Sequence, residues 1–121
     1  MSAYVVWIDH EHAKIFHLSA EDKSKVSLKK HEVRHHTSHS KDHQKDASKF
    51  FHEVAGQLSG AKELLLVGPG LGKTHFEAHL KEHHHAALAK AVVGVKTCSE
   101  ISDNEVLALA REFFKTYDQF H

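Results

Sequence analysis

The sequence has little cysteine and no long apolar run. Its single cysteine, Cys98, cannot form a disulfide within the chain, and its place at the end of an apolar segment predicts a core or edge residue rather than a nucleophile. Every apolar run is far shorter than the roughly 20 residues that cross a membrane. The first residues also lack the basic start and apolar stretch of a signal peptide. These absences predict a cytoplasmic protein that does not enter a membrane.

The length and the apolar pattern predict one domain built around a sheet. A chain of 121 residues can bury one hydrophobic core but leaves little room for a second, so we expect a single domain at 1–121. Four consecutive branched apolar residues at 64–67 predict a strand covered on both faces, as in a parallel sheet. Four more strands are predicted, at 4–9, 13–18, 25–33 and 91–96, and the third is polar enough for a sheet edge.

Three helices are expected between and after these strands. The first should run from Asp46 to about 58, the second, continuous or broken, from about 75 to 88, and the third from a capping box at 102–105. A second capping-box pattern, Thr74 to Glu77, lies at the start of the middle helix. The last helix should bury a stripe formed by Val106, Leu109, Ala110, Phe113 and Tyr117.

The resulting order of elements is β-β-β-α-β-α-β-α. Three antiparallel strands, followed by two parallel strands that helices connect, is the order of the ribonuclease H-like fold. Right-handed crossovers would place helices on both faces of the sheet. We therefore predict an α/β protein with a three-layer, ribonuclease H-like fold around a mixed five-stranded sheet.

The turn after the 64–67 strand reads Gly-Pro-Gly-Leu-Gly-Lys-Thr and ends like a phosphate-binding loop. Its spacing does not fit that role, because the motif needs four residues between its first glycine and the Gly-Lys-Thr, whereas three separate Gly68 from Gly72. No later apolar run ends in the aspartate that would hold magnesium. The pattern favours a structural strand-to-helix turn over nucleotide hydrolysis and leaves an occasional anion contact open.

The order of elements also suggests a metal-dependent nuclease, which would need several converging carboxylates. Asp9 ends the first strand and Glu53 lies on the first helix, but the 64–67 strand ends in Gly68 without an acid. The acids at the start of the last helix serve as caps. The sequence therefore contains no complete catalytic set, and we predict that the protein is not an enzyme.

A formal net charge of zero conceals a basic stretch. Residues 23–49 hold eight lysines and arginines against three acids, together with five histidines. Within this stretch, 34–45 contains no aliphatic residue, which predicts a polar, histidine-rich loop at about 34–46. Such a surface would attract the phosphates of RNA. The candidate RNA contacts are Lys29, Lys30, Arg34, His35, His36, His39, Lys41, His43, Lys45 and Lys49.

Three histidines on the expected middle helix suggest a different class of function. His75, His79 and His83 recur every four residues, so their rings would lie along one helix face. Two histidines one turn apart form half of a zinc or nickel site, although a complete site needs three or four ligands. A solvated polar surface explains the same spacing. We therefore expect no cofactor, with zinc or nickel binding as the alternative.

Several segments together resemble a known family. These are Val5-Val6-Trp7-Ile8-Asp9 with its hairpin, the polar loop, the Phe50-Phe51 helix, and above all Leu-Leu-Leu-Val-Gly-Pro-Gly-Leu-Gly-Lys followed by a helix. They are similar to the middle domain of archaeal and eukaryotic peptide-chain release factors and of the ribosome-rescue factor Pelota. The chain also looks like the small bacterial single-domain relatives labelled translational machinery proteins. The resemblance implies a ribonuclease H-like fold and a position near ribosomal RNA.

The catalytic feature of the release factors is missing from this sequence. In that family a Gly-Gly-Gln tripeptide in the loop before the first helix promotes peptidyl-tRNA hydrolysis, whereas residues 34–45 contain no glycine and only Gln44. Pelota-like members also lack the tripeptide and use the domain as a basic module. We therefore predict a non-catalytic module that binds RNA or the ribosome, with a histidine-rich divalent-metal-binding protein as the alternative.

RNA binding should depend on pH if the histidine-rich stretch makes the contact. Protonation near the reference pKa of about 6.5 would add positive charge beside phosphate. We expect tighter association with ribosomal RNA at pH 6 than at pH 8 at fixed salt, measured by filter binding. The difference should disappear in a variant in which glutamine replaces His31, His35, His36, His39 and His43. Equal affinity at both pH values in the unsubstituted protein would contradict a role for these histidines.

Overall fold

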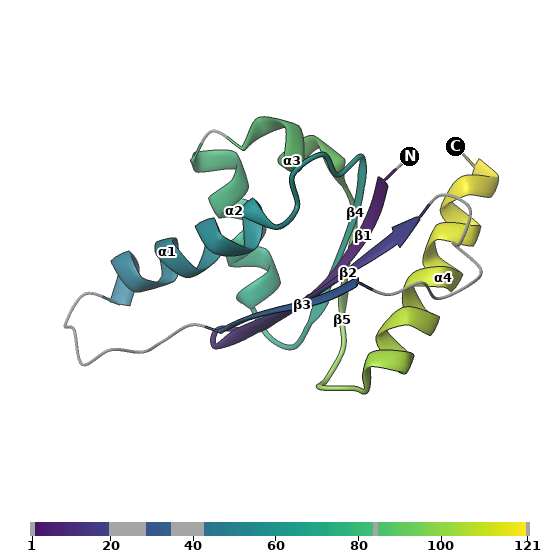
Figure 1. The fold of residues 1–121 in the computed structure, drawn as a ribbon, viewed down its shortest axis with the longest axis horizontal. Coiled ribbons are helices and arrows are strands. Elements are labelled where there is room, and N and C mark those ends of the chain that lie inside the picture. The colour runs from purple at the N-terminus through teal and green to yellow at the C-terminus, as the bar shows by residue number, and fades with distance from the viewer. Residues whose placement is uncertain (1, 20–28, 35–42, 84, 121) are drawn as a thin grey trace.

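The computed structural model describes residues 2–19, 29–34, 43–83 and 85–120, and Figure 1 shows their arrangement. Five strands and four helices follow one another within these described residues. They are β1 (Ser2–Ile8), β2 (His12–Ser19), β3 (Lys29–Arg34), α1 (His43–Gly56), β4 (Glu63–Gly68), α2 (Gly72–Glu82), α3 (Ala86–Ala91), β5 (Val92–Thr97) and α4 (Asp103–Phe120). No helix among these described residues has the length and apolarity needed to span a membrane.

The strands form one mixed sheet in the order β3-β2-β1-β4-β5. β2 pairs antiparallel with both β1 and β3, while β4 pairs parallel with both β1 and β5. This arrangement confirms the α/β class and the mixed sheet. Four strands, β1, β2, β4 and β5, agree with the expected bounds within two residues. The third strand is described from Lys29, and its expected first residues, 25–28, lie outside the described part of the chain.

The helix boundaries correct two expectations and decide a third. α1 begins at His43, three residues before Asp46. α2 begins at Gly72, so Thr74 is inside the helix and not its cap, and the N-cap residue Leu71 makes no side-chain capping hydrogen bond. The helix expected at about 75–88, continuous or broken, is broken, because α2 ends at Glu82 and α3 starts at Ala86. Histidine is a poorer helix former than the residues on either side, which favours a break in the His83–His85 run.

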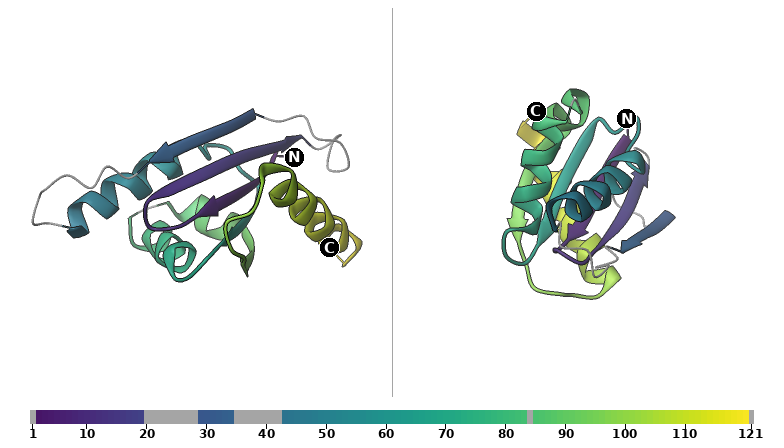
Figure 2. Two further views of the ribbon diagram at one scale, coloured as in Figure 1. Left: turned by 90° about the horizontal axis from the view of Figure 1, so that it is seen from below. Right: turned by 90° about the vertical axis from the view of Figure 1, so that its left-hand side faces the viewer.

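The sheet separates two hydrophobic clusters. Side chains alternate along β1, so Val6 and Ile8 face one cluster while Val5 and Trp7 face the other. α1, α2 and α3 cover the first face and α4 covers the second, as the two views in Figure 2 show. The interior strand β4, which lies between β1 and β5, is buried along its whole length, as its unbroken apolar run predicts.

α4 starts as expected and buries part of the expected stripe, Val106 and Ala110. The Glu105 amide donates to Ser102 Oγ at 3.2 Å, and the Ser102 amide donates to Glu105 Oε1 at 3.2 Å, which confirms the capping box. The buried residues of the helix are Val106, Leu107, Ala110 and Phe114. Leu109, Phe113 and Tyr117 are only partly buried. The Phe113 ring lies beside Gly94 on the edge strand β5, where the missing Cβ leaves room for it.

Two glycines allow the β4–α2 turn to pack against the end of β1. Gly68 has a φ of 146°, and a Cβ at this position would collide with the backbone carbonyl of Ile8. A Cβ on Gly72 would lie 2.8 Å from the carbonyl carbon of Asp9. The close approach of three backbone segments therefore requires glycine at both positions.

Replacing Gly68 with alanine should test this contact. Because the new methyl would require an unfavourable φ and displace the β1 backbone, we expect Gly68→Ala to lower the free energy of unfolding by about 3 kcal/mol. Gly56→Ala is the matched control, since no atom lies within 4 Å of its would-be Cβ. That variant should equal or slightly exceed the unsubstituted protein in stability. Urea unfolding measures both, and equal stabilities would contradict the proposed packing.

Candidate functional site

The glycine-rich turn directs its lysine back to its own backbone. Lys73 is 4% exposed, and its Nζ donates a hydrogen bond to the Gly70 carbonyl at 2.6 Å. The Cys98 amide donates to the Gly68 carbonyl at 3.0 Å, so β5 also contacts the turn. Burial raises the pKa of the Cys98 thiol above its ordinary value, which keeps the thiol protonated and a poor nucleophile. These contacts support the structural interpretation of the turn.

Asp9 has a structural role in the β1–β2 hairpin. Its Oδ1 accepts hydrogen bonds from the Glu11 amide at 2.8 Å and from the His12 amide at 2.7 Å. Such bonds are typical of an aspartate that forms a turn. Because the backbone already uses this carboxylate oxygen, the geometry gives Asp9 a folding role in the hairpin.

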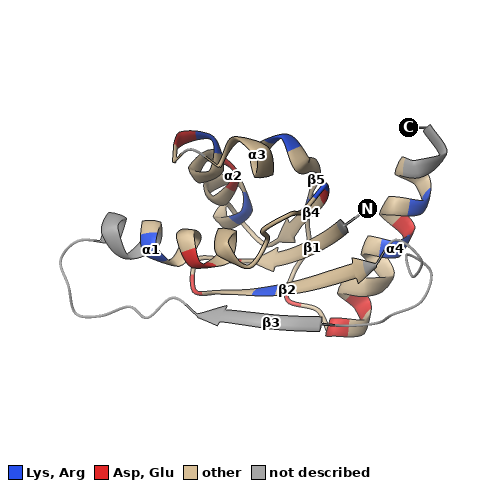
Figure 3. Cartoon of the chain, turned by 45° about the horizontal axis from the view of Figure 1, so that its top comes forward, with Lys and Arg blue, Asp and Glu red and all other residues tan. Residues whose placement is uncertain are grey.

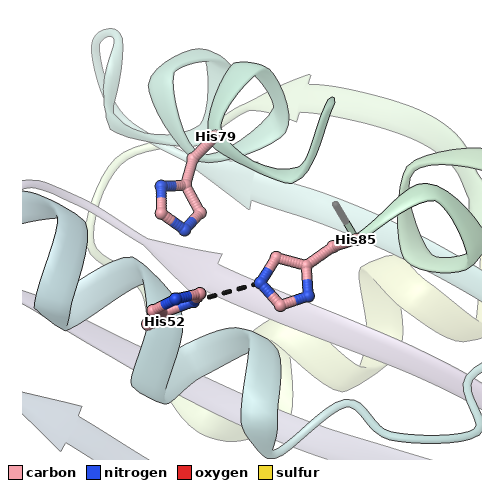
Figure 4. Close-up of side chains that lie close together, drawn as sticks. All are labelled: His52, His79 and His85. Atoms are coloured by element: carbon pink, nitrogen blue, oxygen red, sulfur yellow. Dashed lines mark hydrogen bonds between the residues drawn. The ribbon is translucent and has the colours of Figure 1, made fainter. Parts of the chain in front are cut away.

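Three histidines from separate segments converge on the side of the sheet that α1, α2 and α3 cover. His52 lies on α1, His79 lies on α2, and His85 lies in the turn between α2 and α3. Each offers one ring nitrogen, and these three atoms lie within 4.8 Å of one another. His52 Nδ1 and His85 Nε2 are 3.1 Å apart. Figure 4 shows the three rings facing one another between the helices, and we call them the histidine cluster.

His79 is the buried member of this histidine cluster. Its side chain is 5% exposed, and its ring lies 5.4 Å from that of Phe51. Its Nε2 is buried and has no hydrogen-bond partner among the described residues. Desolvation by burial, followed by the nearby His83, His52 and His85, lowers the pKa of His79 to about 4. The ring is therefore neutral at pH 7, and a buried nitrogen is left for a ligand to use.

The structure separates the three histidines proposed from their spacing. The His79 and His83 rings stack with centroids 4.3 Å apart. His75 instead contacts His10 on the β1–β2 turn, with ring nitrogens 3.4 Å apart. Sequence reasoning missed His52 and His85. The only sequence signal for His85 was the run of three histidines at 83–85. His52 had no signal, because nothing in the sequence spacing places α1 beside α2.

The proposed RNA contacts lie at one edge of the sheet where the chain is described. Lys29, Lys30 and Arg34 are on β3, and the α1 residue Lys49 is exposed. His43 and Lys45 are in the first turn of α1. The remaining four, His35, His36, His39 and Lys41, lie outside the described residues. Elsewhere, α2 and α4 each carry both acidic and basic residues, as Figure 3 shows.

Protonation of His79 should destabilise the fold in acid. The pKa of His79 in the folded state, about 4, lies below the ordinary value of 6.5. Its contribution to the free energy of unfolding is therefore fully present above pH 6.5 and is lost as pH falls towards 4. In metal-free buffer, lowering the pH from 7 to 4.5 should reduce the unfolding free energy of the unsubstituted protein by about 2 kcal/mol more than that of His79→Gln. Urea titrations at the two pH values measure this difference.

His75→Gln serves as the control for that comparison, because the His75 side chain is exposed. It should retain the pH dependence of the unsubstituted protein. If His79→Gln retains it as well, the burial of an uncharged His79 ring is not the cause of the acid sensitivity.

Comparisons with known proteins show a likeness of fold. No model of a protein family matches the sequence, and no curated protein matches it. Among solved structures, Pelota from Archaeoglobus fulgidus superimposes with a TM-score of 0.60 and 20% identity, over 97% of this chain and 35% of that one. Pelota from Thermoplasma acidophilum gives a TM-score of 0.63 and 17% identity, over 88% of this chain and 30% of that one.

The archaeal translation termination factor aRF1 gives a TM-score of 0.64 and 14% identity, over 98% of this chain and 39% of that one. The chain therefore spans roughly a third of the length of each of these proteins. At such low identities the comparisons show the fold alone. They confirm that this chain is similar in structure to part of Pelota and of an archaeal release factor.

Proposed function

We propose that this chain is a non-catalytic module that binds ribosomal RNA in the translation apparatus. The observation that carries the proposal is the likeness of almost the whole chain to part of Pelota and of a translation termination factor. β1 pairs antiparallel in the β1-β2-β3 unit and parallel in the β1-β4-β5 unit. This strand order supports a ribonuclease H-like classification of the fold.

A basic edge of the sheet is the proposed contact surface. β3 is at one end of the strand order and carries Lys29, Lys30 and Arg34 within six residues. α1 lies against β3 and adds the exposed Lys49. We call these four residues the basic edge. Clustered lysines and arginines bind phosphate through charge and hydrogen bonds and carry little information about base sequence.

Two features support binding without catalysis. The sequence before α1 lacks the Gly-Gly-Gln tripeptide of the release factors. The polar groups at the β1 and β4 ends are occupied by structural contacts, since Asp9 holds the hairpin amides and Lys73 holds a loop carbonyl. A histidine-based metal function is compatible with this module and rests on separate residues.

Neutralising the basic edge should weaken RNA binding. We expect the variant with glutamine at Lys29, Lys30, Arg34 and Lys49 to bind a ribosomal RNA fragment at least about tenfold more weakly at physiological salt. The reason is that binding releases fewer counterions from the RNA when phosphate contacts are lost. The slope of log affinity against log salt should fall by about 1 for each contact removed. Filter binding over a salt series measures both quantities, and co-sedimentation with ribosomes provides a second readout.

A control variant carries the same change of charge elsewhere. Glutamine replaces four exposed lysines away from the basic edge, namely Lys62, Lys81, Lys90 and Lys115. This variant should keep most of the affinity of the unsubstituted protein. Equal losses in the two variants would show a non-specific effect of net charge, and an unchanged affinity in the basic-edge variant would refute the proposed surface.

A further inference from the structure

The geometry points to a metal site in which His52, His79 and His85 bind one divalent transition ion, with zinc as the best fit. This inference is independent of the proposed RNA contact. Within the described residues, the histidine cluster is the one group of at least three histidine, cysteine, aspartate or glutamate side chains whose ligand atoms converge. The residues are separated by 27 and 6 positions in the sequence, so folding alone brings them together.

The spacing of the nitrogens is close to that of a zinc site. Zinc binds histidine nitrogen at about 2.0–2.1 Å in tetrahedral geometry, which places two ligand nitrogens roughly 3.3–3.4 Å apart. His52 Nδ1 and His85 Nε2 already lie 3.1 Å apart, and the three ligand atoms of the group all lie within 4.8 Å of one another. The His52 side chain is exposed on α1 and can rotate to close this gap.

The buried nitrogen of His79 is the second observation that points to a ligand. In Figure 4 the ring nitrogen farthest from the His79 backbone points towards His52 and His85. This atom, Nε2, is buried and has no hydrogen-bond partner among the described residues. Leaving a polar group buried and unpaired costs free energy. A metal ion between the three rings would accept the lone pair and remove that cost.

The backbone holds two of the three ligands in place. The His85 amide donates to the Leu80 carbonyl at 3.2 Å, and the His85 carbonyl accepts from the Ala89 amide at 2.9 Å. His79 is fixed within α2, with its ring against Phe51. An ion would therefore meet a partly organised site, which reduces the ordering that binding requires.

The ligand set selects the class of metal. Neutral imidazoles suit zinc, nickel and copper, whereas magnesium and calcium prefer the oxygen ligands that are missing from this group. Three histidines leave one tetrahedral position for water or another ligand. His83 lies on the rim of the cluster, where its exposed ring stacks on His79. The bound ion would connect α1 to the α2–α3 turn.

Zinc titration of the full chain without an affinity tag tests the site. After treatment with a chelator, calorimetry at pH 7.5 should show one saturable ion per chain at micromolar affinity or tighter. Saturating zinc should raise the melting temperature by several degrees, because the ion prefers the folded state. Cobalt substituted for zinc should give the visible absorption of a tetrahedral ion, which reports coordination directly.

Single alanine variants decide whether the proposed residues are the ligands. His52→Ala and His85→Ala should lower zinc affinity at least tenfold and abolish the melting shift. Both residues are accessible, so these changes should leave the fold intact, as circular dichroism would verify. His79→Ala should show the same loss where it remains folded, and the two accessible variants keep the test decisive if it does not.

The pair formed by His10 and His75 provides the matched control. These two exposed histidines also have ring nitrogens close together, at 3.4 Å, but within the described part of the chain they do not belong to a converging group of three ligands. His75→Ala should therefore keep the zinc affinity and melting shift of the unsubstituted protein. An equal loss in His75→Ala and His52→Ala would overturn the proposal, and so would several weakly bound ions without a melting shift.

Discussion

The parallel pairing of β1 with β4 is the contact on which the rest of the fold depends. Both strands are buried on both faces, so the helices must cover the sheet from either side. At the end of this pair, Gly68 and Gly72 bring the turn against the β1 backbone. That turn fixes where α2 begins. The position of α2 in turn sets where His79 enters the space beside α1.

The buried His79 of the histidine cluster lowers the stability of the fold in a way that an apolar core residue would not. A residue such as leucine at position 79 would pack against Phe51 without an unpaired nitrogen and without a charge to suppress in acid. Proteins retain buried polar groups where a partner or a function compensates for them. The surrounding rings of His52, His83 and His85 are mostly accessible, so the compensating partner can arrive from solvent.

The sequence was sufficient for the features that depend on local patterns. The unbroken apolar run at 64–67 identified the interior strand β4, and the Ser102–Glu105 box identified the start of α4, because both signals are complete within a few residues. The start of α2 was missed since it depends on how Gly72 packs against Asp9, which is far away in sequence. His52 and His85 were missed for the same reason. Their approach depends on the packing of α1 against α2, and no spacing rule within one helix describes it.

The edges of the sheet have a consequence for how the molecule behaves at high concentration. β3 and β5 end the strand order, and an edge strand can act as a template for pairing with another chain. On β5 the apolar side chain of Val95 is 40% exposed, which favours such pairing. Lys96 follows it on the same strand, and Lys29 and Lys30 occupy the other edge. Lysine in an edge strand opposes pairing with a second copy, because two like strands side by side would bring like charges together. We therefore expect these lysines to disfavour growth into a continuous intermolecular sheet.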